Sequence, residues 1–380
     1  MKIMLFCYVE QWKVEISNWT NILACLPHEF VIVPFMKLAE VPKYSEVIHE
    51  TKRLSDNVSF DPVYLRSTNS GFRNLLFPNI ALADSLSIFN AISRSKPDIV
   101  VCFYISHAYP LAVFKKIFGF SLCVYALGSD MNLENSLLQN IVRRFVFANS
   151  KLIFSVSNQM KTKIEEVTDR RVIVIPSSVD LSFFRPLFSR ADLRKKWGIK
   201  TRKVILTVCH LDKNKGVDVL MKAFRKINST DVGLLIAGDG PERESLKQLA
   251  DILGIGEQVK FLGFRNREEL LELYNLADLF ALASYSEGLP RVLIEAMGCG
   301  CIPLVTNVGD ATAVVNSGLN GFVVNPGDPE EMGESIKYIF TLAERSLNII
   351  RDSARCMVAD DFDSEKVIKK LVESIVSIRS

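Results

Sequence analysis

Glycine is scarce in the first half of this chain. Only three of the 19 glycines lie within residues 1–186, and none precedes Gly71. Without glycine after the first apolar run, residues 2–9, the backbone there is poorly suited to a close approach by a ligand. Histidine is scarce as well, with four residues and no ligand-like spacing, so we expect no metal site.

The chain also lacks paired cysteines. Its eight cysteines include no Cys-x-x-Cys pair, and most lie in apolar runs such as Val-Val-Cys-Phe-Tyr. Buried cysteines in such runs behave as small apolar residues. The pattern predicts free thiols in a reducing cytosol and argues against a disulfide framework or a cysteine-bound metal.

Long apolar runs and a strong charge of either sign are missing too. No uninterrupted apolar stretch reaches the roughly 18 residues of a spanning helix, and Glu10 ends the first apolar run too early for a signal peptide. The net charge of +3 divides into +4 for residues 1–186 and −1 for the rest, too little to indicate nucleic acid. We expect a cytoplasmic protein, with peripheral contact with the anionic inner face of the membrane as an open alternative to an evenly solvated surface.

Short apolar runs alternate with longer amphipathic segments along the whole chain. Parallel strands covered on both faces are continuously apolar, so this pattern predicts βαβ units and an α/β fold. The expected strands are residues 2–9, 30–34, 98–104, 120–126, 151–156, 172–176, 203–208, 232–237, 258–262, 277–283 and 302–305.

Length and glycine usage predict two domains. Residues 175–186 contain two prolines in a turn-rich stretch, which favours a boundary there. We expect one Rossmann-like domain at 1–186 and a second at 187–363. The spacing of apolar residues in 364–380 predicts an amphipathic helix, which either ends the second domain or crosses back to the first. Ligands should lie at the carboxyl ends of the strands, facing a cleft between the domains.

The stretch from Ser284 to Met297 is the most informative segment. It places Glu287 on the loop after an apolar run and Glu295 eight positions later, with Pro290 expected as the first helical residue. Free amides at a helix start bind anions, and carboxylates accept hydrogen bonds from hydroxyls. A ligand with both phosphate and hydroxyl groups suits this arrangement.

Three more loops follow expected strands. Each has a plain structural reading: a charged turn, a strand–turn–helix joint and an ordinary strand end. Each also has a functional one, as a phosphate contact or a surface for a flat base. They are Cys209 to Gly216 with His210 and Lys215, Gly238-Asp-Gly-Pro241, and Phe261-Leu-Gly-Phe264.

Taken in this order and spacing, the loops resemble the donor-binding domain of the family 4 glycosyltransferases, which are retaining enzymes of the GT-B fold. The resemblance is dense from His210 to about Pro329 and includes Gly318-Leu-Asn-Gly-Phe-Val-Val-Asn-Pro-Gly-Asp328. It implies two Rossmann-like domains, an acceptor-binding one at 1–186 and a donor-binding one at 187–363. It also implies catalysis without a metal or other cofactor.

The resemblance further assigns roles to individual residues. Lys215, helped by His210, would neutralise the donor diphosphate, Glu287 would hold the donor sugar, and Glu295 would bind the ribose. The remaining donor-binding positions implied by the family are Gly238, Phe264, Gly288, Leu289 and Pro290. The donor would be a nucleotide-diphosphate sugar, with a UDP-sugar favoured over a GDP-sugar.

The first domain offers two further catalytic candidates, His107 and Asp130. His107 follows the strand expected at 98–104, although a packed histidine fits equally well, and Asp130 survives in Leu127-Gly-Ser-Asp130 where the family has His-Gly-x-Asp. His210 stands where the family usually has arginine. Asp361-Phe-Asp363 matches a metal-binding Asp-x-Asp, but its place before the last helix favours capping.

The resemblance implies transfer to a saccharide or polyprenyl-linked acceptor, as in surface polysaccharide or lipopolysaccharide biosynthesis. Two alternatives remain open: a sugar-nucleotide 2-epimerase of the same fold, and a non-catalytic nucleotide-sugar-binding subunit. The first needs no acceptor, and the second would bind donor without transfer.

Overall fold

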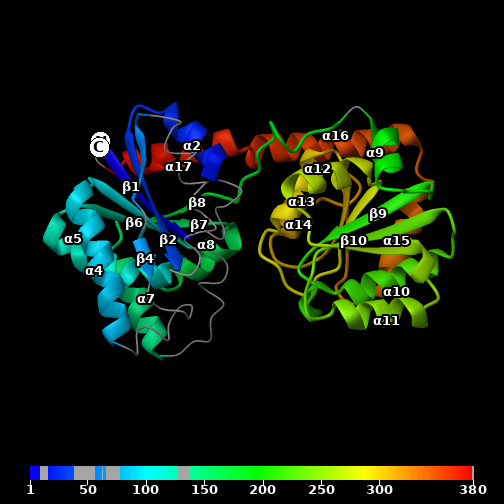
Figure 1. Ribbon diagram of the computed structural model, residues 1–380, viewed down its shortest axis with the longest axis horizontal. Helices are drawn as coiled ribbons and strands as arrows, with labels where there is room; N and C mark the ends of the chain where they lie inside the picture. The colour runs from blue at the N-terminus through cyan, green and yellow to red at the C-terminus, as the bar shows by residue number, and fades with distance from the viewer. Residues whose placement is uncertain are drawn as a thin grey trace. The chain divides into compact units, whose positions relative to one another are not determined.

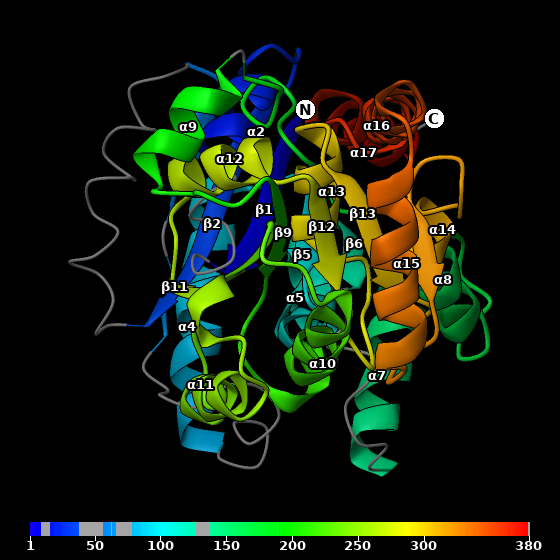
Figure 2. The same cartoon turned by 90° about the vertical axis from the view of Figure 1, so that its right-hand side faces the viewer.

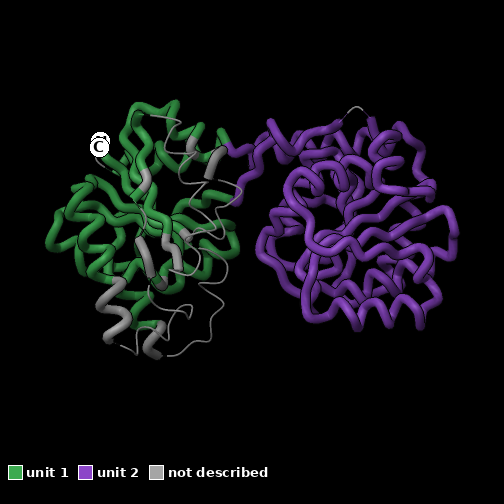
Figure 3. Tube along the Cα trace, viewed as in Figure 1, with its two compact units in different colours: residues 1–176, 365–380 green, residues 177–364 purple. Residues whose placement is uncertain are grey.

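The computed structural model describes residues 1–8, 16–37, 56–61, 63–65, 78–126, 137–187 and 189–378. The chain divides into two compact units. Unit 1 comprises Met1–Pro176 and Glu365–Ser380, and unit 2 comprises Ser177–Ser364 (Figure 3). Residues 177–186, expected in the first domain, therefore belong to unit 2. Phe184 is buried in the core of that unit, and Asp180 pairs with Arg267 at 2.7 Å.

Unit 1 is built on a parallel sheet. Its order is β3-β2-β1-β5-β6-β7-β8, with β4 also pairing with β2, and these strands all pair in parallel. The strands are β1 (Lys2–Tyr8), β2 (Glu29–Lys37), β3 (Val58–Phe60), β4 (Val63–Leu65), β5 (Ile99–Phe103), β6 (Ser121–Ala126), β7 (Leu152–Ser155) and β8 (Val172–Val174).

Helices of unit 1 lie between these strands in the chain, except the last, which follows unit 2 (Figure 1). They are α2 (Ile16–Ala24), α4 (Pro78–Ser95), η3 (Ile105–His107), α5 (Ala108–Phe118), α7 (Leu137–Asn149), α8 (Asn158–Glu165) and α17 (Ser364–Val376). The last of them, α17, joins the core of unit 1 through Val367, Ile368, Leu371 and Ile375, all buried. These four residues follow the 3.6-residue period that predicted this helix.

Unit 2 has the strand order β11-β10-β9-β12-β13-β14, again all parallel. Its strands are β9 (Lys203–Val208), β10 (Val232–Ala237), β11 (Val259–Gly263), β12 (Leu279–Leu282), β13 (Ile302–Thr306) and β14 (Phe322–Val324). Its helices are α9 (Arg190–Lys196), η4 (Lys213–Lys215), α10 (Val217–Ile227), α11 (Arg243–Ile252), η5 (Gly256–Gln258), α12 (Arg267–Leu276), α13 (Arg291–Gly298), α14 (Ala311–Val314), α15 (Pro329–Thr341) and α16 (Glu344–Asp361).

Both faces of the unit 2 sheet are covered. One core packs α10, α11 and α15 against one face, and the other packs α12, α13 and α16 against the opposite face. Figures 1 and 2 show these two helix layers on either side of the strands. Along β9, Ile205 points to the first core while Val204 and Leu206 point to the second, as the alternation of a strand requires. The predicted fold of two doubly wound Rossmann-like units is confirmed.

Each sheet reverses its winding direction once. The reversal lies between β1 and β5 in unit 1 and between β9 and β12 in unit 2. Open parallel sheets bind ligands outside the carboxyl ends of the strands at such a switch point. In unit 2 the loops in question are those that follow β9 and β12.

The eleven expected strands all form, with ends shifted by no more than two residues except at β2, which continues to Lys37. The sequence missed β3, β4 and β14, which have three residues each, too few for a recognisable apolar run. Within the described parts of the chain, no helix is both long and apolar enough to cross a membrane. All eight cysteines are free thiols, five of them buried.

Candidate functional site

Lys215 and Glu287 meet at the switch point of unit 2. Lys215 ends η4 after β9, Glu287 follows β12, and Lys215 Nζ lies 2.7 Å from Glu287 Oε1. The sequence separates them by 72 positions, so only the adjacency of β9 and β12 brings them together. Both side chains are mostly buried, which strengthens their attraction relative to an exposed pair.

Glu287 is held by one of its two carboxylate oxygens. Ser284 Oγ donates to Oε1 at 2.7 Å, the same oxygen that Lys215 contacts. Among the described residues, Oε2 receives no hydrogen bond, which leaves it available to a hydroxyl. The arrangement therefore fixes the carboxylate and keeps one acceptor open.

The two loops are also joined through their backbones. Tyr285 N donates to Asn214 O at 2.8 Å, and Asn214 Nδ2 donates to Ser286 O at 2.8 Å. Gly216 has φ +58°, and an added Cβ there would lie 2.2 Å from Ala283 O. These contacts fix the position of Lys215 relative to Glu287.

Glu295 lies in a different environment. It is buried in α13, its Oε2 accepts a hydrogen bond from Tyr274 Oη at 3.0 Å, and Arg291 Nη2 lies 3.7 Å from its Oε1. Burial raises the pKa of Glu295. Tyr274 is fully buried in α12 and was missed in the sequence, because it precedes Glu295 by 21 positions and no local spacing connects them.

The start of α13 differs by one residue from the sequence prediction. Pro290 is the N-cap and the helix begins at Arg291, so the prediction of Pro290 as the first helical residue was wrong. The φ of −69° suits proline, but its ψ of 121° is extended, not helical. The loop Gly288-Leu289-Pro290 thus leads directly to the amides of the first turn, which have no helical partner.

The remaining donor candidates lie at other strand ends of unit 2. His210 is exposed after β9, and the Phe264 side chain after β11 is 80% exposed. The Gly238 amide already donates to Gly263 O at 2.8 Å, and an added Cβ would lie 1.8 Å from Cys209 O. Gly238 is thus needed for close packing of the loops; its contact with a donor stays a prediction, as do those of His210 and Phe264.

The first domain holds two catalytic candidates, and the structure describes only one of them. His107 ends η3 after β5, beside the switch point of unit 1, and its ring packs edge-on to Tyr104 with centroids 6.2 Å apart. Burial lowers the pKa of His107 from 6.5 to about 4, so the imidazole is neutral at neutral pH. Asp130 lies outside the described residues.

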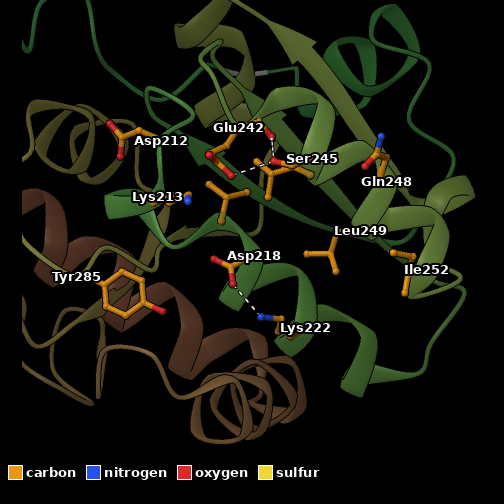
Figure 4. Close-up of a pocket in the computed structure, with 12 residues that line it drawn as sticks. Asp212, Lys213, Asp218, Lys222, Glu242, Ser245, Gln248, Leu249, Ile252 and Tyr285 are labelled. Carbon is orange, nitrogen blue, oxygen red and sulfur yellow. Dashed lines mark hydrogen bonds and ion pairs between the residues drawn. The ribbon is translucent and has the colours of Figure 1, made fainter.

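A hollow of about 510 Å³ lies between α10 and α11 (Figure 4). Asp212, Lys213 and Tyr285 line one end of it, so it borders the loops of the Lys215–Glu287 pair without including either residue. Its other charged groups have partners within the hollow: Lys222 pairs with Asp218, and Ser245 donates to Glu242 (Figure 4). None of the predicted donor-binding residues lines this hollow.

Comparisons with known proteins agree on the fold. The structure resembles that of Anabaena HepE in complex with UDP, with a TM-score of 0.81 at 20% identity over 99% of this chain and 100% of the other. It also resembles a sucrose-phosphate synthase from Thermosynechococcus elongatus, with a TM-score of 0.80 at 16% identity over 100% and 99% of the chains. The shared architecture is GT-B.

Sequence comparisons give the same assignment. The chain is 28% identical over 310 residues to N-acetyl-alpha-D-glucosaminyl L-malate synthase of Bacillus anthracis, covering 77% of this chain and 78% of the relative. It is 34% identical over 191 residues to D-inositol 3-phosphate glycosyltransferase of Mycolicibacterium smegmatis, which is 48% of this chain but only 43% of that relative. Residues 189–355 match the family described as "Glycosyl transferases group 1". The Lys215–Glu287 contact lies within this matched part of the chain, and the match agrees with the family that the motifs predicted.

Proposed function

We propose that this protein is a glycosyltransferase that moves a sugar from a nucleotide-diphosphate sugar to an acceptor. The observation that carries the proposal is the contact of Lys215 with Glu287 across the switch point of unit 2. A cation for the diphosphate and a carboxylate for sugar hydroxyls lie within a few ångströms of each other there. The family assignment of residues 189–355 supports the same activity.

The two residues would act on opposite parts of the bond that breaks. As the anomeric bond breaks, negative charge builds up on the diphosphate, and Lys215 with the free amides at the start of α13 would stabilise it. Glu287, fixed through Oε1, would accept sugar hydroxyls at Oε2 and hold the anomeric carbon in place. Glu295 would bind the ribose.

We further propose that the reaction retains the anomeric configuration and needs no metal ion. Unit 2 supplies two carboxylates to orient the donor, one on a loop and one in α13, and neither is placed as a nucleophile by its partners. Front-face attack, with the leaving phosphate taking the acceptor proton, fits this set of residues. The acceptor would be a saccharide or a polyprenyl-linked saccharide bound by unit 1, with His107 and Asp130 as its candidate residues.

UDP is the favoured nucleotide of the donor, and surface polysaccharide or lipopolysaccharide biosynthesis is the favoured setting. A solved neighbour of the same fold is described with UDP-glucose bound. A thermal-shift screen of uridine, guanosine and adenosine diphosphate sugars tests the nucleotide, because a ligand raises apparent stability in proportion to its affinity. A stronger response to a guanosine than to a uridine diphosphate sugar would contradict the preference for UDP.

The first prediction concerns the site itself. Glu287→Ala and Lys215→Ala should each reduce turnover at least about a hundredfold while the protein stays folded, because each removes a charge aligned with the donor. The measurement is product formation from the best donor with and without a chelator, and the anomeric configuration of the product by NMR. Lys213→Ala, two positions from Lys215 and directed into the neighbouring hollow, is the matched control.

Five outcomes contradict parts of the proposal. Activity of both variants within a few-fold of the wild type would refute the site. Inverted product or loss of turnover in chelator would refute retention or metal independence. Conversion of the donor sugar in the absence of any acceptor would identify the 2-epimerase alternative, and donor binding with no turnover would identify the binding subunit.

A further inference from the structure

Exposed large apolar side chains gather on one helix layer of unit 1. In the described part of this unit, all five such residues lie on α4, α5 and α7: Leu86, Tyr109, Val113, Ile117 and Ile141. The three helices are neighbours, since Phe89 of α4 packs on Phe114 and Phe118 of α5, and Tyr109 of α5 packs on Phe145 of α7. We call these five residues the apolar patch. Large exposed apolar patches mark interaction sites in soluble proteins.

Helix α5 shows why this patch is unusual. Its inner face buries Ala108, Leu111 and Ala112 against the sheet. Its outer face is largely apolar as well, with Val113 40% and Ile117 64% exposed beside the exposed Lys116. A surface helix normally turns polar residues outward, and a helix that is apolar all round is normally covered by something.

Basic residues lie on two of the three helices that carry the patch. Helices α5 and α7 contain no acidic residue but carry Lys115, Lys116, Arg143 and Arg144. Lys116 and Arg144 are exposed, whereas Arg143 is buried.

More cations converge at the end of α7. Lys115 Nζ donates to Asn149 O at 2.6 Å and Arg170 Nη2 donates to Ala148 O at 2.7 Å, at the negative end of that helix. Partial burial lowers the pKa of Lys115, and the nearby charges of Arg170 and Lys151 lower it further.

From this juxtaposition of apolar side chains and cations on the outer face of α4, α5 and α7, we propose that the apolar patch docks on an anionic lipid bilayer. Aliphatic and aromatic side chains on such a face insert at the boundary of headgroups and acyl chains, and lysine and arginine pair with the anionic headgroups. A protein partner could cover apolar side chains too, but α5 and α7 carry four basic residues and no acidic one, and α4 carries one acidic residue, Asp84. This charge balance favours a negatively charged surface as the partner. The inference goes beyond the proposed activity and does not depend on it.

The test is co-sedimentation of the full chain with phosphatidylcholine vesicles that contain or lack phosphatidylglycerol. We expect binding to the anionic vesicles only, weakened by salt. Ile117→Asp and Lys116→Glu should each weaken it about tenfold or more, through loss of insertion and reversal of a charge near the surface. The matched controls are Ile252→Asp, at an isoleucine of unit 2 that is 81% exposed, and Lys337→Glu, at an exposed lysine of α15.

Vesicle binding needs no donor or acceptor, so its failure is distinguishable from failure of the proposed activity. No binding by the wild type, or equal losses in the control variants, would overturn the inference. A dimer that forms with rising concentration and is abolished by Ile117→Asp would show instead that a second copy covers the patch. Circular dichroism of each variant verifies that it is folded.

Discussion

Single side chains decide how Glu287 and Glu295 differ, although both lie in one short stretch of sequence. Glu287 is oriented by Ser284 and Lys215 through one oxygen, whereas Glu295 is buried against a tyrosine. The sequence pattern predicted both as donor ligands on equal terms. Their packing differs: Glu287 keeps one carboxylate oxygen open, whereas Glu295 accepts a hydrogen bond from Tyr274 and burial raises its pKa.

Tyr274 is therefore expected to act as a positioning residue for Glu295. Tyr274→Phe keeps the ring in its aromatic cluster with Phe280 but removes the hydrogen bond to Glu295 Oε2. Hydrogen bonds to charged groups contribute about 1.5–3 kcal/mol, so we expect the KM for the donor to rise about tenfold with kcat changed much less.

Steady-state kinetics over a range of donor concentrations measures KM and kcat separately. A purely structural loss would not raise the donor KM while leaving kcat nearly unchanged. Tyr338→Phe removes a hydroxyl from a tyrosine that is 57% exposed and serves as the control. Unchanged donor KM in Tyr274→Phe, together with weakened donor binding in Glu295→Gln, would refute the positioning role while leaving the site intact.

At the scale of elements, the carboxyl ends of strands organise the site. The alternation of apolar runs identified eleven strands, and their loops hold every candidate of unit 2 except Glu295, which lies in α13. The sequence could not predict the order of the strands, because pairing depends on how the helices cover the sheet. That order places the loops after β9 and β12 side by side and so creates the Lys215–Glu287 contact.

A third loop supports this pair. Gly309, after β13, has φ +55°, and an added Cβ would lie 1.9 Å from Glu287 O. Gly309→Ala should displace the backbone of Glu287 and lower turnover about tenfold or more, because small misplacements of positioning groups are costly. The backbone strain alone is about 1–2 kcal/mol.

Gly318→Ala is a matched control, since Gly318 has φ +80° but nothing within 4 Å of an added Cβ. It imposes a similar backbone strain without the collision. Turnover and thermal unfolding of the two variants distinguish the backbone strain from the collision with Glu287 O. Equal turnover in both would mean that Gly309 serves the backbone conformation only.

At the scale of the whole molecule, the two units are not two consecutive pieces of sequence. The chain passes from unit 1 to unit 2 at Pro176 and returns at Ser364, so that α17 completes the core of unit 1. The sequence predicted α17 as an amphipathic helix and left open which domain it joins. A helix pattern defines an apolar face but not the surface that the face covers.

We expect the stability of unit 1 to depend on this last helix. Ile368 is fully buried in the core of unit 1, and Ile368→Ala should destabilise that unit by about 2–5 kcal/mol through lost burial and a cavity. Donor-induced stabilisation of unit 2 should persist. Lys370→Ala, at an exposed position of α17, is the control.

Denaturant unfolding followed by far-UV circular dichroism, with and without the best donor, measures both effects. The transition that does not respond to donor should shift in Ile368→Ala, while the transition that responds to donor stays in place. A shift of the donor-responsive transition alone would show that α17 stabilises unit 2 instead.

The sequence by itself determined the order of strands and helices along the chain, the α/β class and the motifs of the group 1 family, because apolar periodicity and local loop chemistry are properties of neighbouring residues. The tertiary structure decided which distant residues touch: Lys215 with Glu287, Tyr274 with Glu295, α17 with unit 1, and the apolar patch assembled from three helices. These contacts depend on strand order and helix packing, which arise only when buried surfaces from distant parts of the chain are matched.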